Sequence, residues 1–279
     1  MKPIRLDKFL ADSGLGTRSQ VKSLLKKKLV TVNGAPAGKP EQKIDPETDT
    51  VVCRGKPLTY TEFFYYMLNK PAGYVSATDD NTAPTVLSLL KGAPGKDLFP
   101  VGRLDKDTEG LLLLTNDGPL AHRLLSPRRH VDKTYFVRAE GAVTKADLLR
   151  LEEGIDIGEE KPTLPAKARL LRVLSSDGGN PKDSPAPSEP VLPSGDGPRN
   201  GTAARSGKMP SAEFSEVLLT IHEGKFHQVK RMFAAIGKPV LYLKRLSIGG
   251  VSLDESLKPG QFRALTKEEL ERLTAGQTN

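Results

Sequence analysis

The sequence predicts an α+β protein with a small basic unit at residues 1–60 and a larger unit at residues 61–275. Helix-like and strand-like patterns mix without a regular strand–helix–strand rhythm, which argues against a doubly wound parallel sheet. Residues 1–60 carry 12 Lys or Arg and 6 Asp or Glu, so they hold +6 of the total charge of +8. Residues 175–212 include 7 Pro, 6 Gly and 7 Ser, a composition typical of a disordered insertion.

The small unit is predicted to contain two helices followed by strands. Leu6, Phe9 and Leu10 have the spacing of a short amphipathic helix. Thr17 and Gln20 form a capping-box pattern that starts a second helix. Further along, the sequence predicts a strand at residues 29–32, a hairpin turn at Asn33-Gly34 and a strand at residues 50–54.

A row of cations lies on the second predicted helix. Arg18, Lys22 and Lys26 are spaced by four residues, so they share one side of the helix, and Lys27 extends the row. The alternative interpretation is a solvated face without a partner. Because this small unit holds most of the net charge and is too small to act alone as an enzyme, we expect the row to bind nucleic acid.

Strands and turns dominate the first half of the larger unit, with strands predicted at residues 63–68, 111–115 and 134–137. The first of these strands is expected to stop at Asn69-Lys70-Pro71, a rigid basic turn. Asn116-Asp117-Gly118 is expected to lead into a helix whose buried side holds Leu120, Leu124 and Leu125.

The second half of the larger unit surrounds the insertion. Residues 168–174 and 214–221 are both strand-like, so we expect them to pair as an overgrown hairpin. The sequence then predicts a short helix at residues 227–235 that buries Val229, Met232 and Phe233, strands at residues 240–243 and 246–248, and a final helix that starts with a capping box at Thr266 and Glu269.

Several classes of protein are excluded by composition. The apolar runs, such as Leu111 to Leu114, are far too short to span a membrane. The N-terminus carries charges every few residues and does not resemble a secretory signal. Cys53 is the single cysteine, so it cannot form an internal disulfide or a zinc knuckle, and we expect it to be a small buried residue. We therefore expect a cytoplasmic protein without a membrane partner.

Two segments resemble metal sites but lack essential ligands. Residues 105–110 match the first half of a calcium loop, but position 12 is Asn116 rather than Glu, and leucines fill the second half. Residues 222–227 resemble a zinc-protease motif, but the two histidines are five residues apart and do not share a helix face. His122 and His130 have no partner at ligand spacing. We expect neither a metal nor a cofactor.

Asp105 is the candidate reactive group. It follows an apolar approach and begins a charged turn, which fits either a structural cap or a carboxylate held in a cleft. Tyr135 offers an aromatic ring that can stack on a base, and Lys230 lies on a short helix where a cation would favour an ionised carboxylate. This combination, with Lys70 in the basic turn, suits nucleophilic or base chemistry on a nucleotide.

The chain resembles bacterial rRNA pseudouridine synthases of the RsuA type. The motifs that carry the resemblance are NKPAGY from Asn69, GRLDKDTEGLLLLTNDG from Gly102, KTY from Lys133 and EGKFHQVKRMFAAIGKPVLYLKRLSIGG from Glu223. The segment from Arg5 to Gly34 resembles the S4 RNA-binding domain that precedes the catalytic domain in that family. The resemblance covers nearly the whole chain except residues 175–212, an insertion that is long for the family.

The resemblance implies isomerisation of uridine to pseudouridine in a folded RNA, without cofactor or metal. The aspartate of the family falls on Asp105, which would act on a flipped-out uridine by attacking the sugar or base or by abstracting a sugar proton. The tyrosine that stacks on the uracil falls on Tyr135, the paired basic residue on Lys230, and the motif arginine, which would hold the extruded nucleotide, on Arg103. The remaining cations expected to contact RNA are Lys70, Arg5, Lys8, Arg18, Lys22, Lys26 and Lys27.

The expected partner is ribosomal RNA within an assembling subunit, bound by a monomer. Residues 77–80 and 84–87 look most like the enzymes that act on small-subunit (16S) rRNA. Relatives with the same motifs modify 23S rRNA, which remains an alternative substrate. A non-catalytic S4-type assembly protein is a further alternative, against which the joint presence of Asp105, Tyr135 and Lys230 argues.

Overall fold

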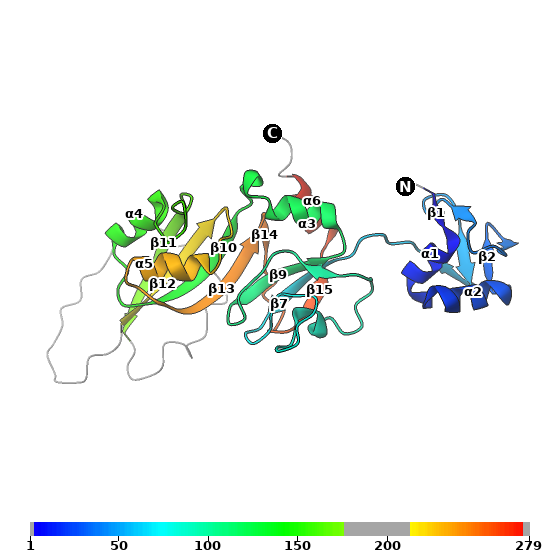
Figure 1. Cartoon of the computed structure of the whole chain (residues 1–279), viewed down its shortest axis with the longest axis horizontal. Helices are drawn as coiled ribbons and strands as arrows, with labels where there is room; N and C mark the ends of the chain where they lie inside the picture. Colours follow the sequence, from blue (N-terminus) through cyan, green and yellow to red (C-terminus); the bar gives the residue numbers. More distant parts are fainter. Residues whose placement is uncertain (1–2, 176–212, 276–279) are drawn as a thin grey trace.

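The computed structural model describes residues 3–175 and 213–275 (Figure 1). The N-terminal unit has a hydrophobic core of its own, which includes Leu6, Phe9 and Val30. Tyr60 closes this core, and its ring stacks on Phe9 with 5.3 Å between ring centroids. The rest of the described chain packs around one large sheet with separate cores on its two faces. The division of the chain at residue 60 stays a prediction, which the separate N-terminal core supports.

Two helices pack on small sheets in the N-terminal unit. The capping box at Thr17 is confirmed, because the Gln20 amide donates to Thr17 Oγ1 and the Thr17 amide donates to Gln20 Oε1. Asn33 and Gly34 both have positive φ, 51° and 80°, as a two-residue hairpin turn requires. The elements are β1 (Ile4–Arg5), α1 (Leu6–Leu10), a π-helical turn (Ala11–Leu15), α2 (Arg18–Lys26), β2 (Val30–Val32), β3 (Ala35–Pro36), β4 (Lys43–Ile44), β5 (Val51–Cys53) and β6 (Lys56–Leu58).

A nine-stranded sheet forms the frame of the larger unit. Seven strands follow the order β11-β12-β10-β13-β9-β7-β15, and β14 and β8 pair with β13 and β9. Among the described pairs in this sheet, only β13 with β9 is parallel, which confirms an α+β fold rather than a doubly wound one. The strands are β7 (Tyr65–Lys70), β8 (Phe99–Pro100), β9 (Glu109–Thr115), β10 (Lys133–Glu140), β11 (Lys167–Ser175), β12 (Glu213–Ile221), β13 (Val240–Ile248), β14 (Val251–Ser252) and β15 (Phe262–Ala264).

Helices cover the two faces of this sheet at different places (Figure 1). On one face, α4 (Lys145–Glu153) and α5 (Gln228–Ala235) pack with Leu112 and Leu114 of β9. On the other face, α3 (Gly118–Leu125) and α6 (Lys267–Ala275) pack with Leu111 and Leu113. The leucine run of β9 is therefore buried on both sides, as its unbroken apolar sequence requires. Short 3-10 helices occupy Val86–Leu89 and Pro127–Arg129.

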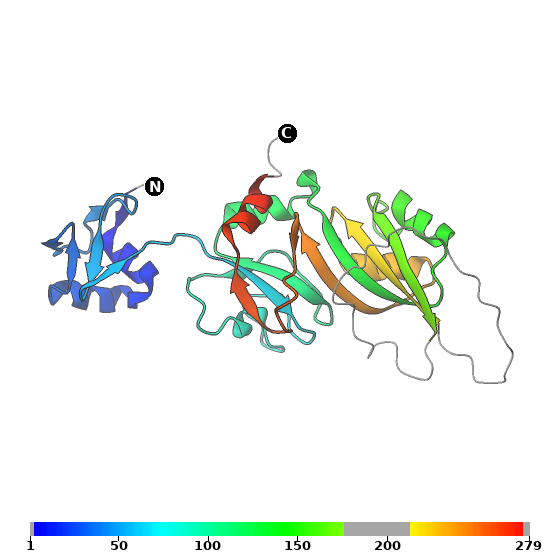
Figure 2. The same cartoon turned by 180° about the vertical axis from the view of Figure 1, so that it is seen from behind.

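The expected hairpin around the insertion is confirmed. Strands β11 and β12 pair antiparallel from Lys167 opposite Thr220 to Ser175 opposite Glu213, and Figure 2 shows β11 at the edge of the sheet. The predicted insertion itself, apart from Ser175, lies outside the described residues. Cys53 is buried, as expected. No helix in the described part of the chain is long and apolar enough to cross a membrane.

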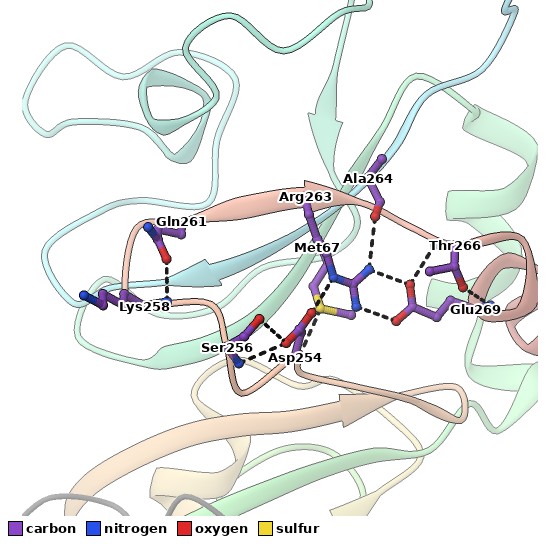
Figure 3. Close-up of polar contacts among 9 residues, drawn as sticks. All are labelled: Met67, Asp254, Ser256, Lys258, Gln261, Arg263, Ala264, Thr266 and Glu269. Atoms are coloured by element: carbon purple, nitrogen blue, oxygen red, sulfur yellow. Dashed lines mark hydrogen bonds and ion pairs between the residues drawn. The ribbon is translucent and has the colours of Figure 1, made fainter.

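The C-terminal segment is tied to the sheet through Arg263 (Figure 3). Its guanidinium on β15 donates to Asp254 at 2.6 Å and to Glu269 of α6 at 2.7 Å. Hydrogen bonds from Ser256 and Arg263 lower the pKa of Asp254 to about 2. Glu269 also accepts from the Thr266 amide and donates its own amide to Thr266 Oγ1, so the predicted capping box is confirmed. These contacts fix the start of α6 against the edge strand.

Three local predictions need correction, and one helix was not predicted. Strand β7 does not stop at Asn69-Lys70 but pairs both residues with Leu111 and Gly110, because a neighbouring strand satisfies their backbone. The strands predicted at 240–243 and 246–248 form the single strand β13, in which Arg245 is buried. Leu125 is 42% exposed rather than buried. Helix α4 was not predicted, because it fully buries only Leu151 and its apolar stripe is weak.

Candidate active site

Asp105 lies in the loop that leads into β9. The two apolar residues before it, Val101 and Leu104, are buried and fix the path of the loop. Leu104 is also held by Ser76, whose Oγ donates to the Leu104 carbonyl at 2.9 Å and accepts from its amide at 3.0 Å. The Thr108 amide donates to the Asp105 carbonyl, which closes a tight turn after the carboxylate. The backbone therefore places Asp105 at a defined point while its side chain stays 24% exposed.

Lys230 of α5 contacts Asp105, so the fold brings these two predicted residues together. Its Nζ lies 3.0 Å from Asp105 Oδ2 and 2.5 Å from Asp107 Oδ1. His227, directly before α5, places Nε2 at 3.5 Å from Asp105 Oδ1. Burial alone would lower the pKa of Lys230, but the hydrogen bonds with Asp107 and Asp105 outweigh it and raise that pKa. The ammonium is therefore charged at neutral pH.

Tyr135 lies on β10 and points to the same face of the sheet as the α5 helix. It belongs to the same hydrophobic core as Leu104, the neighbour of Asp105, and is 7% exposed. Opposite Tyr135 on β13 lies Arg245, whose buried Nε donates to the Leu111 carbonyl at 2.8 Å. Two residues away, burial and the nearby Arg245 guanidinium lower the pKa of Lys133 to about 8. Two buried cations thus lie on the Tyr135 side of the site.

Lys70 does not face RNA, which corrects the sequence-based expectation. The side chain is fully buried, and its Nζ donates to the carbonyls of Pro71 at 3.0 Å, Lys106 at 3.2 Å and Thr108 at 2.7 Å. Burial, opposed by nearby carboxylates, lowers the pKa of Lys70 to about 8. Two of the three acceptors flank Asp107 in the loop that carries Asp105. Lys70 therefore holds this loop rather than contacting a ligand.

The remaining predicted cations lie at the surface in two different states. Arg5 pairs with Asp7 at 2.8 Å and Lys8 pairs with Asp12 at 2.6 Å, so their charges are compensated. The other predicted RNA-binding cations are exposed and have no ion-pair partner among the described residues: Arg103 near Asp105, and the α2 row of Arg18, Lys22, Lys26 and Lys27. The α2 row therefore presents an uncompensated positive face.

Two residues of the site were missed by sequence reasoning. Asp107 was considered only as part of a failed calcium loop, and His227 only as part of a failed zinc motif. The spacing of His227 and Lys230 by three residues places them on one side of a helix start, and this signal could have found His227. His222, the other histidine of that motif, pairs instead with Asp132 at 2.6 Å. No cluster of three or more possible metal ligands occurs within residues 3–175 and 213–275.

The sequence of this chain was compared with the sequence profiles of known protein families, and two of them match. The sequence profile of the RNA pseudouridylate synthase family matches residues 64–235, which span Asp105, Tyr135 and Lys230. The chain belongs to the RNA pseudouridine synthase family. The S4 domain profile matches residues 4–51, so this pseudouridine synthase carries an N-terminal S4 domain. It is an isomerase that acts on RNA.

Similar proteins span the full length of this pseudouridine synthase. The uncharacterized RNA pseudouridine synthase YtzG of Bacillus subtilis is 44% identical over 275 residues, which are 98% of this chain and all of that protein. The ribosomal small subunit pseudouridine synthase A of Escherichia coli is 37% identical, covering 96% of this chain and 98% of that one. A crystal structure described as a pseudouridylate synthase superposes with a TM-score of 0.58 and 37% identity, covering 97% and 99% of the two chains.

Proposed function

We propose that this enzyme converts a specific uridine of small-subunit (16S) rRNA to pseudouridine. The reaction replaces the bond from the ribose to N1 of uracil with a bond to C5; the hydrogen at C5 leaves as a proton, and N1 takes up a proton. The 37% identity to the Escherichia coli ribosomal small subunit pseudouridine synthase over nearly the whole chain supports this substrate. The S4 domain and the α2 cations would bind the RNA, and the larger unit would carry the chemistry.

The observation that carries the proposal is the setting of Asp105. Its carboxylate is held by a rigid loop, lies 3.0 Å from the Lys230 ammonium and keeps 24% of its surface exposed. A paired but accessible carboxylate can stay ionised and still reach a ligand. Asp105 would act on a uridine flipped out of the RNA, attacking the sugar or base or abstracting a sugar proton.

The neighbouring residues would position the nucleotide. Tyr135 would stack on the extruded uracil; its ring belongs to the same core as Leu104, the residue before Asp105. Lys230 would orient the carboxylate through its contact at 3.0 Å. Arg103, exposed beside Asp105, would hold the flipped nucleotide through its phosphate. The enzyme would act as a monomer in the cytoplasm on an assembling small subunit, where the RNA target is still accessible.

Sequencing of pseudouridines in rRNA tests the substrate. A strain that lacks the gene should lose one pseudouridine in 16S rRNA, a wild-type copy should restore it, and an Asp105→Asn copy should not. Expression of the variant is checked by immunoblot in the same cells. Loss of a 23S rRNA site instead would replace the proposed substrate, and an unchanged set of pseudouridines would contradict the proposed function.

A further inference from the structure

Phe226 is the most exposed large hydrophobic side chain among the described residues, and no part of the proposed chemistry uses it. Its side chain is 73% exposed, against 53% for Leu149, the next in exposure. It lies in the turn between β12 and α5, directly before His227. Single exposed hydrophobic side chains are common on protein surfaces. What sets Phe226 apart is that it directly precedes and stacks on His227, which contacts Asp105.

The ring of Phe226 is held in place rather than free. It stacks on the His227 ring with 3.9 Å between centroids and 18° between ring planes. The carbonyl of Phe226 accepts a hydrogen bond from Arg231 at 3.1 Å. The turn before it is fixed by Lys225, whose amide donates to Gln228 and whose Nζ donates to the Lys161 and Pro162 carbonyls. A ring presented on a fixed backbone loses little conformational entropy when it binds.

The stack also joins the candidate active site directly. One ring, His227, separates Phe226 from the carboxylate, since His227 Nε2 lies 3.5 Å from Asp105 Oδ1. The edge of the His227 ring is therefore next to Asp105, and the Phe226 ring stacked on its face is exposed to solvent. Arg103, two residues before Asp105, and Lys230, in contact with it, supply positive charge near the carboxylate. A flat apolar surface with cations beside it matches an unpaired base and its phosphate.

We propose that Phe226, backed by His227, is a stacking platform for the RNA base next to the flipped uridine. This inference rests on the proposed function, because it assumes an RNA from which one base is extruded at Asp105. Extrusion leaves the neighbouring base without a stacking partner, and an aromatic side chain offers a replacement. Stacking on a protein ring is tolerant of base identity, so the platform would contribute affinity rather than select a sequence.

A coupled set of protein and RNA changes tests the platform. The probe is a labelled 16S rRNA fragment that contains the modified uridine, with the base on either side of that uridine removed in turn. Phe226→Ala should weaken binding of the intact fragment about 5- to 100-fold. Removal of the stacked base should weaken binding by wild-type protein to a similar degree and should have no further effect on Phe226→Ala. Phe226→Trp should restore the affinity.

Leu149→Ala on α4 is the matched control, because it also removes an exposed hydrophobic side chain, and its binding should equal that of wild type. The proposed stacking would be contradicted if Phe226→Ala bound the intact fragment with wild-type affinity. It would also be contradicted if removal of either neighbouring base weakened binding equally in the wild-type and Phe226→Ala proteins. Because the assay measures binding, it is independent of turnover. Wild-type protein that binds the fragment without modifying it would instead contradict the proposed function.

Discussion

Asp105 and Glu216 are two carboxylates that are both paired with cations, but their surroundings differ. Glu216 lies within β12, is fully buried, and binds Arg138 of β10 at 2.7 Å and Arg172 of β11 at 2.6 Å. Asp105 lies in a loop, is 24% exposed, and is paired at 3.0 Å with Lys230 from α5. The first carboxylate is enclosed by neighbouring strands, whereas the second has an open side.

The contrast separates a carboxylate that stabilises the fold from one that can react. Both oxygens of Glu216 accept hydrogen bonds from guanidinium groups, and the side chain is fully buried, so a ligand cannot reach it. Asp105 shares its cation with the 74% exposed Asp107 and keeps access to solvent. Removing the charge of Glu216 should therefore affect folding, and removing the charge of Asp105 should affect turnover.

Glu216→Gln is expected to have the largest effect on stability. The change leaves the buried Arg138 guanidinium opposite a neutral amide, and loss of one member of a buried ion pair costs about 3–5 kcal/mol. Urea unfolding measures the difference, with Glu213→Gln on the exposed end of the same strand as the control, expected within about 0.5 kcal/mol of wild type. Turnover per folded Glu216→Gln molecule should match wild type. A Glu216→Gln protein with wild-type stability but no turnover would show that Glu216 serves the reaction rather than the fold.

Lys230→Met is expected to reduce turnover about 100-fold, because the carboxylate of Asp105 loses the ammonium at 3.0 Å that orients it. Single-turnover rates on saturating RNA measure this loss. Lys267→Met removes an exposed cation that is paired with Glu271 on α6 and should leave the rate unchanged. If Lys230→Met turned over at the wild-type rate, Lys230 would not position the carboxylate.

Lys133, two residues from Tyr135 on β10, is a buried cation that forms no ion pair within the described part of the chain. Burial lowers its pKa to about 8 in the folded protein, below about 10.4 in the unfolded chain. The charged form is therefore penalised in the folded state below pH 8, and the penalty is relieved as pH rises from 8 to about 10.4. Lys133→Met should be more stable relative to wild type at pH 7.5 than at pH 9.5. Urea unfolding at both values checks the difference, and a constant difference would contradict the lowered pKa.

The smallest effect is expected from the α2 row, whose cations have no ion-pair partner in the described structure. Replacing Lys22, Lys26 and Lys27 together by Ala should reduce the slope of log affinity against log salt by about 2, if each contacts one single-stranded phosphate. The matched triple replacement by Arg retains the charge and should retain the slope. An unchanged slope in the Ala protein would identify the row as a solvated face.

Much of this arrangement could be predicted from the sequence where local signals decide the structure. Turn and cap chemistry acts over a few residues, so the sequence predicted the Thr17 capping box and the Asn33-Gly34 turn. It predicted the β11–β12 pairing because the segments on both sides of the insertion are strand-like. Lys70 was wrongly placed at the surface, because only the tertiary fold brings three carbonyls around its ammonium. His227 was missed for the same reason, since its approach to Asp105 joins segments that are 122 positions apart in the numbering.

Release of tritium from C5-labelled uridine in rRNA by purified Asp105→Asn protein tests the central claim most directly. The variant should release no tritium above background while it retains RNA affinity and unfolds within about 1 kcal/mol of wild type, because an amide keeps the shape but not the charge. Asp97→Asn is the matched control, since Asp97 is exposed in the loop before β8 and is not part of the candidate site, and it should retain turnover. Turnover by Asp105→Asn at a rate near that of wild type would contradict the assignment of the reaction to Asp105.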